Sequence, residues 1–362
     1  MTNRRAGFSL PEVMISLAIL AIVSVFLMDM LSRQTKTYQV VDQVAEAQTN
    51  LRVITDLLER EIRVTGFMVP EGAAICGVDN VDAPDILVVT DAAVVDPTSQ
   101  IQNDLGIDIT AGYDGNSIDT LTLAGDGTLD GNPFYDIDSD GVADVDLMQV
   151  PGLGQVGGII VADRNNPDRG SSCGQILGGS LVIGGSTVEI QVDYDFGGTE
   201  SSQPLAALAA GSNPEDLVAI PATVYSVNAA SQLTRNGVLL AEDVEDMQVA
   251  LHFDLDDDGV VDGDPRPAPQ FPPFISDAEY PGSIAGGVQY TSGSWDHSTL
   301  REIRVSIVIR TRSQDVATLE NPNLATNTFI AMENRNDPAL PADGFRRRVL
   351  TMTAQPRNLG RR

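Results

Sequence analysis

The chain has 362 residues, of which 42% are hydrophobic, so it can bury a real core and is not a disordered chain. Its 22 Lys and Arg residues against 51 Asp and Glu residues give a net charge of -29, which would repel nucleic acid. An acidic excess of this kind favours solubility, keeps copies of the chain apart, or supplies ligands for hard cations.

The N-terminus is a short basic segment, residues 1–7, followed by an apolar run. From Phe8 to Met28 there are 21 residues with one charge, Glu12, which is long enough to span a bilayer. The run lacks the small-residue cleavage site of a secretory signal peptide, so we expect it to remain in the mature protein. Arg4 and Arg5 precede it, and this positive-inside bias places the N-terminus in the cytoplasm and the rest of the chain beyond the membrane.

Glu12 is unusual because a carboxylate within an apolar membrane segment costs about 2.5 to 3.5 kcal/mol on insertion scales and usually marks function. The residues from Gly7 to Glu12, GFSLPE, closely resemble the type IV prepilin motif. The resemblance implies that a membrane aspartyl peptidase cuts after Gly7 and that the new N-terminal residue, Phe8, is methylated. It also implies that Glu12 pairs with the N-terminal amine of a neighbouring subunit, so that two charges costly in lipid neutralise each other. The alternative is an ordinary signal anchor whose Glu12 reaches the headgroups.

A helical pattern continues beyond the membrane segment. Apolar residues at spacings of three, four or seven predict a stripe that faces a packed surface, and they are Val41, Val44, Leu51, Ile54, Leu58 and Ile62. Gly66 and then Pro70 end the pattern, so we expect one helix from about Pro11 to Thr65, about 80 Å long. Pilins share such a stem, with its second half packed on a β-sheet head.

The chain is expected to divide into four parts: a leader at 1–7, a transmembrane helix segment at 8–29, an amphipathic periplasmic helix at 30–66 and a head at 67–362. Short β-like runs separated by Gly, Asp and Pro predict that the head is mainly β, and these runs cover residues 85–90, 117–123, 158–162, 180–183 and 187–194. The expected fold class is α+β, with the long helix packed on a mainly antiparallel β head.

Two further signals place strands in the second half of the head. Asn236 and Gly237 lie between two short β-like runs, which predicts a hairpin with a type I′ turn. Residues 301–312 alternate apolar and polar side chains, which predicts a strand with Ile303, Val305, Ile307 and Ile309 inward. The segments from about 92 to 116 and from about 265 to 300 are rich in Gly, Pro, Asp and Ser, and we expect long loops or insertions there.

Three stretches in the last third of the chain resemble the PilW group of minor pilins: residues 243–264, the strand REIRVSIVIRTR and the tail RRRVLTMTAQPRNL. The resemblance implies a non-enzymatic minor pilin of a type IV pilus that enters the fibre by its N-terminal helix and primes assembly at the tip. Its partners would be the prepilin peptidase, other major and minor pilins and the inner membrane, with no nucleic acid. The chain would first cross the inner membrane once, with its head in the periplasm, and then join the fibre at the cell surface.

The two cysteines, Cys76 and Cys173, are too far apart for a CxxC redox motif and too few for a cysteine-based zinc site. In an oxidising compartment we expect them to pair. The bridge would close a loop of about 98 residues, which the chain-entropy model values at roughly 4 to 5 kcal/mol. The alternative is a pair of buried free thiols.

Two acidic segments share the pattern D-x-D-x-D-G-V-x-D-x-D, which is the first half of an EF-hand loop. The candidate calcium ligands are Asp136, Asp138, Asp140, Val142, Asp144 and Asp146 in the first, and Asp254, Asp256, Asp258, Val260, Asp262 and Asp264 in the second. At position 12 of an EF-hand loop, where a Glu normally binds the ion, the two segments have Leu147 and Pro265. The expected dissociation constant for calcium is therefore modest, about 10⁻⁴ to 10⁻³ M. The alternative is a pair of solvated acidic turns.

Catalysis has little support in the sequence. His252 and His297 are the two histidines, and neither has a nucleophile or second metal ligand at motif spacing. Residues 152–157 spell GxGxxG, but the residues after them read as a strand where a nucleotide site needs a helix. Two alternatives to the minor pilin remain open: a bulky pseudopilin of a type II secretion system, and a calcium-dependent adhesin or binding module displayed on the pilus.

Overall fold

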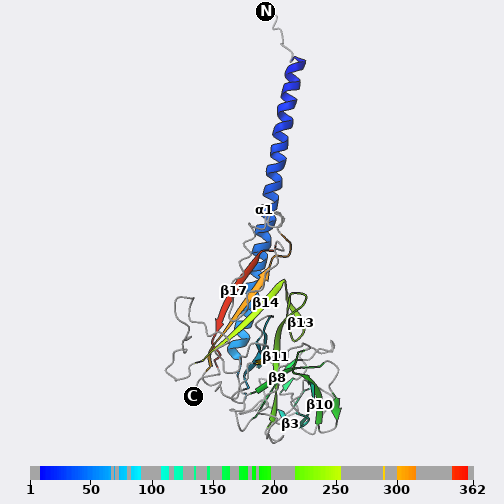
Figure 1. Ribbon diagram of the computed structural model, residues 1–362, viewed down its shortest axis with the longest axis vertical. Coiled ribbons are helices and arrows are strands. Elements are labelled where there is room, and N and C mark those ends of the chain that lie inside the picture. The colour runs from blue at the N-terminus through cyan, green and yellow to red at the C-terminus, as the bar shows by residue number, and fades with distance from the viewer. Residues whose placement is uncertain are drawn as a thin grey trace, which may run out of the picture.

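The architecture is one long helix that enters a head of antiparallel strands (Figure 1). The computed structural model describes residues 9–66, 69, 73–79, 83–90, 107–113, 118–124, 134–135, 145–146, 157–163, 171–177, 182–184, 187–196, 217–253, 288–289, 300–314 and 345–357. Within these residues every strand pair is antiparallel. The coarse prediction, a long N-terminal helix on an antiparallel β head, is therefore confirmed.

Helix α1 spans Leu10–Val64, 55 residues, or about 82 Å at the usual rise. Ser9 has an extended backbone and Pro11 lies in the first turn, where a missing N–H costs no intrahelical bond. As expected, the helix ends just before Gly66. The φ of Gly66 is 83°, in the left-handed region that glycine enters without a Cβ clash. Both helix ends lie within one residue of the prediction.

The strands of the head follow in chain order. They are β1 (Ile75–Asp79), β2 (Ile86–Thr90), β3 (Ile107–Ala111), β4 (Ile118–Ala124), β5 (Phe134–Tyr135), β6 (Val145–Asp146), β7 (Gly158–Asp163), β8 (Ser171–Ile176), β9 (Val182–Gly184), β10 (Thr187–Asp193), β11 (Leu217–Asn228), β12 (Gln232–Arg235), β13 (Val238–Glu242), β14 (Val244–Phe253), β15 (Val288–Gln289), β16 (Leu300–Arg310) and β17 (Arg347–Ala354). The strands predicted from periodicity are present, with shifts of up to two residues at their ends.

The segments 92–116 and 265–300, expected to be long loops or insertions, are not loops throughout. Strand β3 lies in the first segment and β15 in the second. Strand β3 is five residues long and buries Ile107 and Ile109. Because only two apolar side chains point inward, and Gly and Asp surround them, the pattern is too short to stand out from loop composition.

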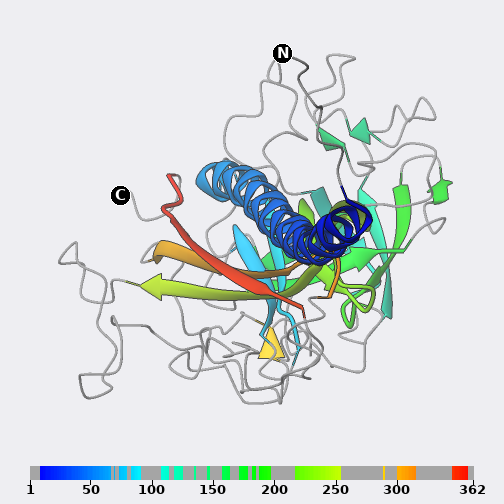
Figure 2. The ribbon, with the colours of Figure 1, turned by 90° about the horizontal axis from the view of Figure 1, so that it is seen from above.

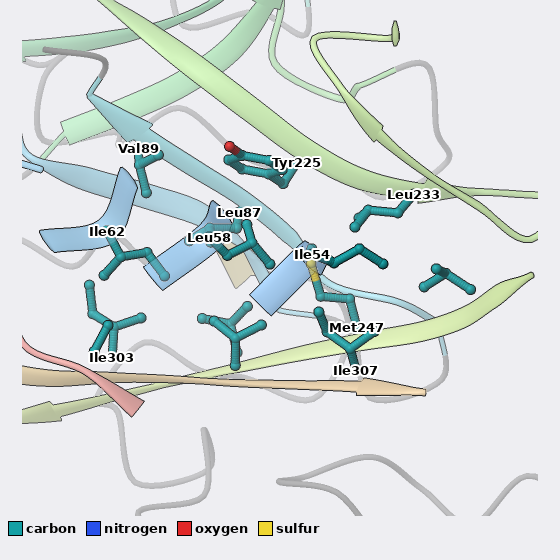
Figure 3. Close-up of a cluster of buried hydrophobic side chains, with 14 of the residues drawn as sticks. Ile54, Leu58, Ile62, Leu87, Val89, Tyr225, Leu233, Met247, Ile303 and Ile307 are labelled. Atoms are coloured by element: carbon teal, nitrogen blue, oxygen red, sulfur yellow. The ribbon is translucent and has the colours of Figure 1, made fainter. Parts of the chain in front are cut away.

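The lower part of α1 is buried between two layers of strands, as Figure 3 shows. Leu58 and Ile62 lie between Leu87 and Tyr225 on one side and Ile303 on the other. One layer is the three-stranded sheet β14–β16–β17, which Figure 2 shows lying against the helix. The other consists of β1, β2, the second half of β11 and β12. We call α1 from Ala47 onward with these two layers the stem unit.

The predicted apolar stripe is confirmed in its lower part alone. Leu51, Ile54, Leu58 and Ile62 are at most 3% exposed, whereas Val44 is half-buried and Val41 is 60% exposed, so within this chain the packed stripe does not extend to Val41. Full burial begins at Ala47, and the strands with the most contact to α1 are β17, β16 and β13. The inward face of β16 is as predicted, with Val305 and its alternate neighbours in the same core.

Six strands pair in a closed ring, in the order β11–β3–β4–β10–β8–β7 and back to β11. We call this ring the barrel. Its interior is a core of its own, made of Ile107, Ile109, Leu121, Leu123, Ile159, Val161, Ile176, Ile190, Val192, Tyr194, Leu217 and Ala219. Figure 1 places β3, β8 and β10 at the end of the molecule far from the N-terminus. The sequence patterns predicted strands here but not their closure.

The predicted hairpin is present between β12 and β13. Asn236 and Gly237 have φ values of 52° and 75°, the positive pair that a type I′ turn requires. The Asn236 side-chain oxygen accepts a hydrogen bond from the Val224 N–H at 2.8 Å, and the Asn236 N–H donates to the Val224 carbonyl at 2.8 Å. These bonds fix the turn onto β11.

Candidate assembly surface on the N-terminal helix

The start of α1 brings a carboxylate to a helix N-terminus. Glu12 is in the first turn, where the helix dipole favours negative charge, and the Ser9 hydroxyl donates to its Oε2 at 3.5 Å. Glu12 is exposed, so its carboxylate is open to a partner from outside this chain. Gly7 and Phe8, the predicted cleavage and methylation positions, lie outside the described residues.

The upper half of α1, residues 10–31, is apolar and long enough to cross a membrane, and nothing in the part of the chain that the structure describes buries it. Its large apolar side chains are 46% to 77% exposed: Leu10, Val13, Met14, Ile15, Leu17, Ile19, Leu20, Ile22, Val23, Val25, Phe26, Leu27, Met28, Met30 and Leu31. The Ser16 and Ser24 hydroxyls donate hydrogen bonds to the backbone carbonyls four residues earlier, so these polar groups have partners within the apolar helix. A surface of this kind must be covered by lipid or by the helices of other subunits.

The apolar stretch ends at an ion pair. Asp29 is the first charged residue after Glu12, and its carboxylate meets the Arg33 guanidinium at 3.0 Å, one turn later. Both side chains are more than half exposed, so they mark where the helix becomes water-compatible.

A group of charged residues, which we call the charged collar, lies beside α1 where the helix enters the head, and no sequence pattern predicted it. Arg310 reaches Asp243 at 3.5 Å and Glu245 at 3.4 Å, and Arg347 donates to Glu245 at 2.9 Å. Arg310 also lies over the Phe345 ring, 4.7 Å from its centroid. Residues at three strand ends are thus tied together beside the helix.

The two cysteines form a disulfide between β1 and β8, with Cα atoms 6.0 Å apart. Both Cys76 and Cys173 are fully buried. The predicted pairing is present, and the alternative of free thiols does not describe this structure. The bond joins the stem unit to the barrel.

The two acidic segments predicted to bind calcium lie almost entirely outside the described residues. The first is closed at its ends by the β5–β6 ladder, in which Phe134 pairs with Asp146. The second follows β14 directly. Among the residues that the structure describes, no group of three or more His, Cys, Asp and Glu side chains could hold a metal ion.

His252 lies on β14 and is 4% exposed. Burial and the neighbouring Arg304 charge lower the pKa of His252 to about 4, partly offset by Glu302, so its imidazole is neutral at pH 7. The residues after the GxGxxG string form strand β7 rather than a helix, as predicted.

Comparison with known proteins gives one family match, to the prokaryotic N-terminal methylation motif, over residues 2–28. No curated protein and no solved structure matches the chain. The motif implies processing by a prepilin peptidase and assembly with other pilins, and it points to a structural subunit rather than an enzyme. The match and the uncovered apolar helix together support a membrane-anchored, type IV pilin-like or pseudopilin-like protein.

Proposed function

We propose that this chain is a minor pilin subunit of a type IV pilus, cleaved after Gly7, methylated at Phe8 and built into the fibre through α1. The observation that carries the proposal is the contrast between the two halves of α1. The upper half, which contains most of the matched methylation motif, is exposed, whereas the lower half is buried in the core of the head. Such a helix is held firmly by its own head and leaves its apolar half for other helices.

The size of the head supports a low-copy position. Residues 67–362 include a barrel at the end far from the N-terminus, in addition to the layers that hold α1. If many copies packed side by side along the shaft of a pilus, the fibre would have to accommodate a barrel at every subunit. A place at the tip, where the subunit primes assembly with other minor pilins, avoids that conflict.

The assembly role is tested by Glu12→Gln, which keeps the shape of the side chain and removes the charge. We expect normal membrane insertion and a large loss of the chain from sheared fibres, because the N-terminal amine of a neighbouring subunit loses its counter-charge. Asp42→Asn, an exposed position lower on the same helix, is the matched control and should assemble normally. Normal fibre recovery of the Glu12→Gln chain would refute the pairing role.

The pilins that co-isolate with the chain decide between the two assembly machines. Recovery with the major pilin of a surface fibre is the expected result. Recovery with pseudopilins of a secretion system would replace the minor pilin by the bulky pseudopilin of type II secretion, which uses the same stem.

The acidic segments are proposed to bind calcium, on the strength of their repeated aspartate spacing. Calcium bound by the folded head would stabilise it by mass action, so titration from 0.1 to about 10 mM should raise the melting temperature. Asp136→Asn with Asp254→Asn should abolish that rise. An unchanged melting temperature and no heat of mixing in the unmodified chain would withdraw both sites.

A further inference from the structure

Strands β2 and β11 pair as the two arms of a hairpin although a long segment separates them. Thr90 is opposite Ala222, Thr223 is opposite Val89, and the pairing continues to Tyr225 and Leu87. Thr90 is the last residue of β2. In an ordinary hairpin two to five residues would join these positions, and here residues 91–221 do so. We call residues 91–221 the inserted segment.

The inserted segment supplies all strands of the barrel, including the first five residues of β11. Among the residues that the structure describes, the buried side chains of the barrel interior all belong to the inserted segment, and none of its side chains belongs to the core around α1. The two cores are therefore built from separate parts of the chain. Strand β11 passes through both, since its first half pairs with β7 and β3 and its second half with β2 and β12.

The contact between barrel and stem unit is a third apolar cluster of mainly small side chains. On the stem side it contains Cys76, Val88 and Val224, and on the barrel side Ile160 and Cys173. The Cys76–Cys173 disulfide crosses this contact. This contact and the disulfide lie outside the core around α1, so the barrel is not needed to complete that core.

The charge of the chain is also divided unevenly. The inserted segment has 21 Asp and Glu residues and 2 Arg residues, a net charge of -19, which leaves -10 for the other 231 residues. Two copies brought side by side would thus repel each other mainly through their inserted segments. The part that must pack against other subunits is the less charged part.

We infer that the inserted segment is a separate module, placed in a turn of an assembly-competent stem unit, displayed at the end of the head far from the membrane helix and fastened by the Cys76–Cys173 disulfide. The stem unit folds and assembles without it. The display part of this inference rests on the proposed pilin function, whereas the separation of the two folding units does not.

The direct test removes the inserted segment from the full chain and joins Thr90 to Ala222 through Asn-Gly, the two-residue loop of a type I′ hairpin. Cys76→Ser, Val88→Thr and Val224→Thr are added because the excision exposes these side chains. We expect a protease-resistant chain that is recovered in sheared fibres as well as the unmodified protein. A protease-resistant chain that is processed at Phe8 but absent from fibres would show that assembly needs the barrel, and would overturn the inference.

A second measurement decides the matter if the excised chain does not fold. Leu121→Asp puts a charge inside the barrel of the full chain, and Thr120→Asp puts the same charge on the exposed face of the same strand. In a hydrogen-exchange measurement, Leu121→Asp should remove the protection of the barrel strands β3, β4, β7, β8 and β10. The elements α1, β14, β16 and β17 should stay protected. Thr120→Asp should change the protection of neither group. Loss of protection in both sets would overturn the inference. The N-terminal mass of the unmodified chain tests the pilin function separately, so failure of one claim is not mistaken for failure of the other.

Discussion

Thr90 and Ala222 lie opposite each other in neighbouring antiparallel strands, although 131 residues separate them in the sequence. This register divides the head into a part that holds α1 and a part that is added to it. The division gives the molecule two parts with different properties: an apolar helix at one end, and an inserted segment with a net charge of -19 that includes the barrel at the other.

The first prediction concerns the packing of α1 into the head. Leu58→Ala should lower the free energy of unfolding by about 2 to 5 kcal/mol, because it leaves a cavity between the two layers of strands. Val53→Ala, on the same helix but 64% exposed, should change it by less than about 0.5 kcal/mol. Urea unfolding of the full chain in detergent measures both, and equal effects would contradict the described burial.

The second prediction compares two fully buried tyrosines. The Tyr225 hydroxyl donates to the Glu61 carboxylate on α1, which Arg235 also meets at 3.2 Å. Tyr225→Phe should therefore cost about 1.5 to 3 kcal/mol, the value of a hydrogen bond to a charged group.

Tyr194→Phe is the matched change in the barrel, where the hydroxyl has no hydrogen-bond partner among the described residues. Burial also raises the pKa of Tyr194, so the phenol is neutral and gains nothing from charge. Tyr194→Phe should leave the free energy of unfolding unchanged or raise it. A greater loss from Tyr194→Phe than from Tyr225→Phe would contradict both assignments.

The third prediction concerns the β12–β13 turn. Gly237→Ala places a Cβ on a residue with φ of 75° and should destabilise the chain by about 1 kcal/mol. Gly237→Asn should recover part of that loss, because Asn tolerates the left-handed region. Thermal melting of the two variants checks the order, and equal melting temperatures of Gly237→Ala and the unmodified chain would rule out the strained turn.

The fourth prediction concerns the disulfide. Cys76→Ala with Cys173→Ala should lower the free energy of unfolding by roughly 4 to 5 kcal/mol, since the denatured chain regains the freedom of a long loop. The unmodified chain in a reducing buffer is the matched control and should lose a similar amount. Labelling of two free thiols in the exported, unfolded and unreduced protein would contradict the bond.

The parts of the fold that could be predicted are those coded by neighbouring residues. The ends of α1 follow from Pro11 and Gly66, and the hairpin follows from Asn236 and Gly237. The inward face of β16 follows from strict alternation around Val305. In each case the physical cause lies within a few residues of the feature.

The barrel could not be predicted in the same way, because its closure depends on pairing between residues far apart. Val218 lies opposite both Asp108 in β3 and Ala162 in β7, and no local pattern encodes that pair of registers. Likewise, Val41 belongs to the helical stripe by spacing but lies above the level at which the head begins. Tertiary contact, rather than local preference, decides these positions.

The candidate assembly surface also has a part that the sequence could predict and a part that it could not. Glu12 and the length of the apolar run could be recognised from the sequence, since a charge in an apolar run and its motif are local signals. The collar of Arg310, Asp243 and Glu245 could not, because it forms where the ends of separate strands meet.

The most direct test of the pilin function is the intact mass and the N-terminal peptide of the full chain, recovered from membranes of cells with an active prepilin peptidase. We expect a chain that begins at N-methylated Phe8 and has lost residues 1–7. A chain that still begins at Met1 under those conditions would contradict the assembly function and leave a signal-anchored β protein.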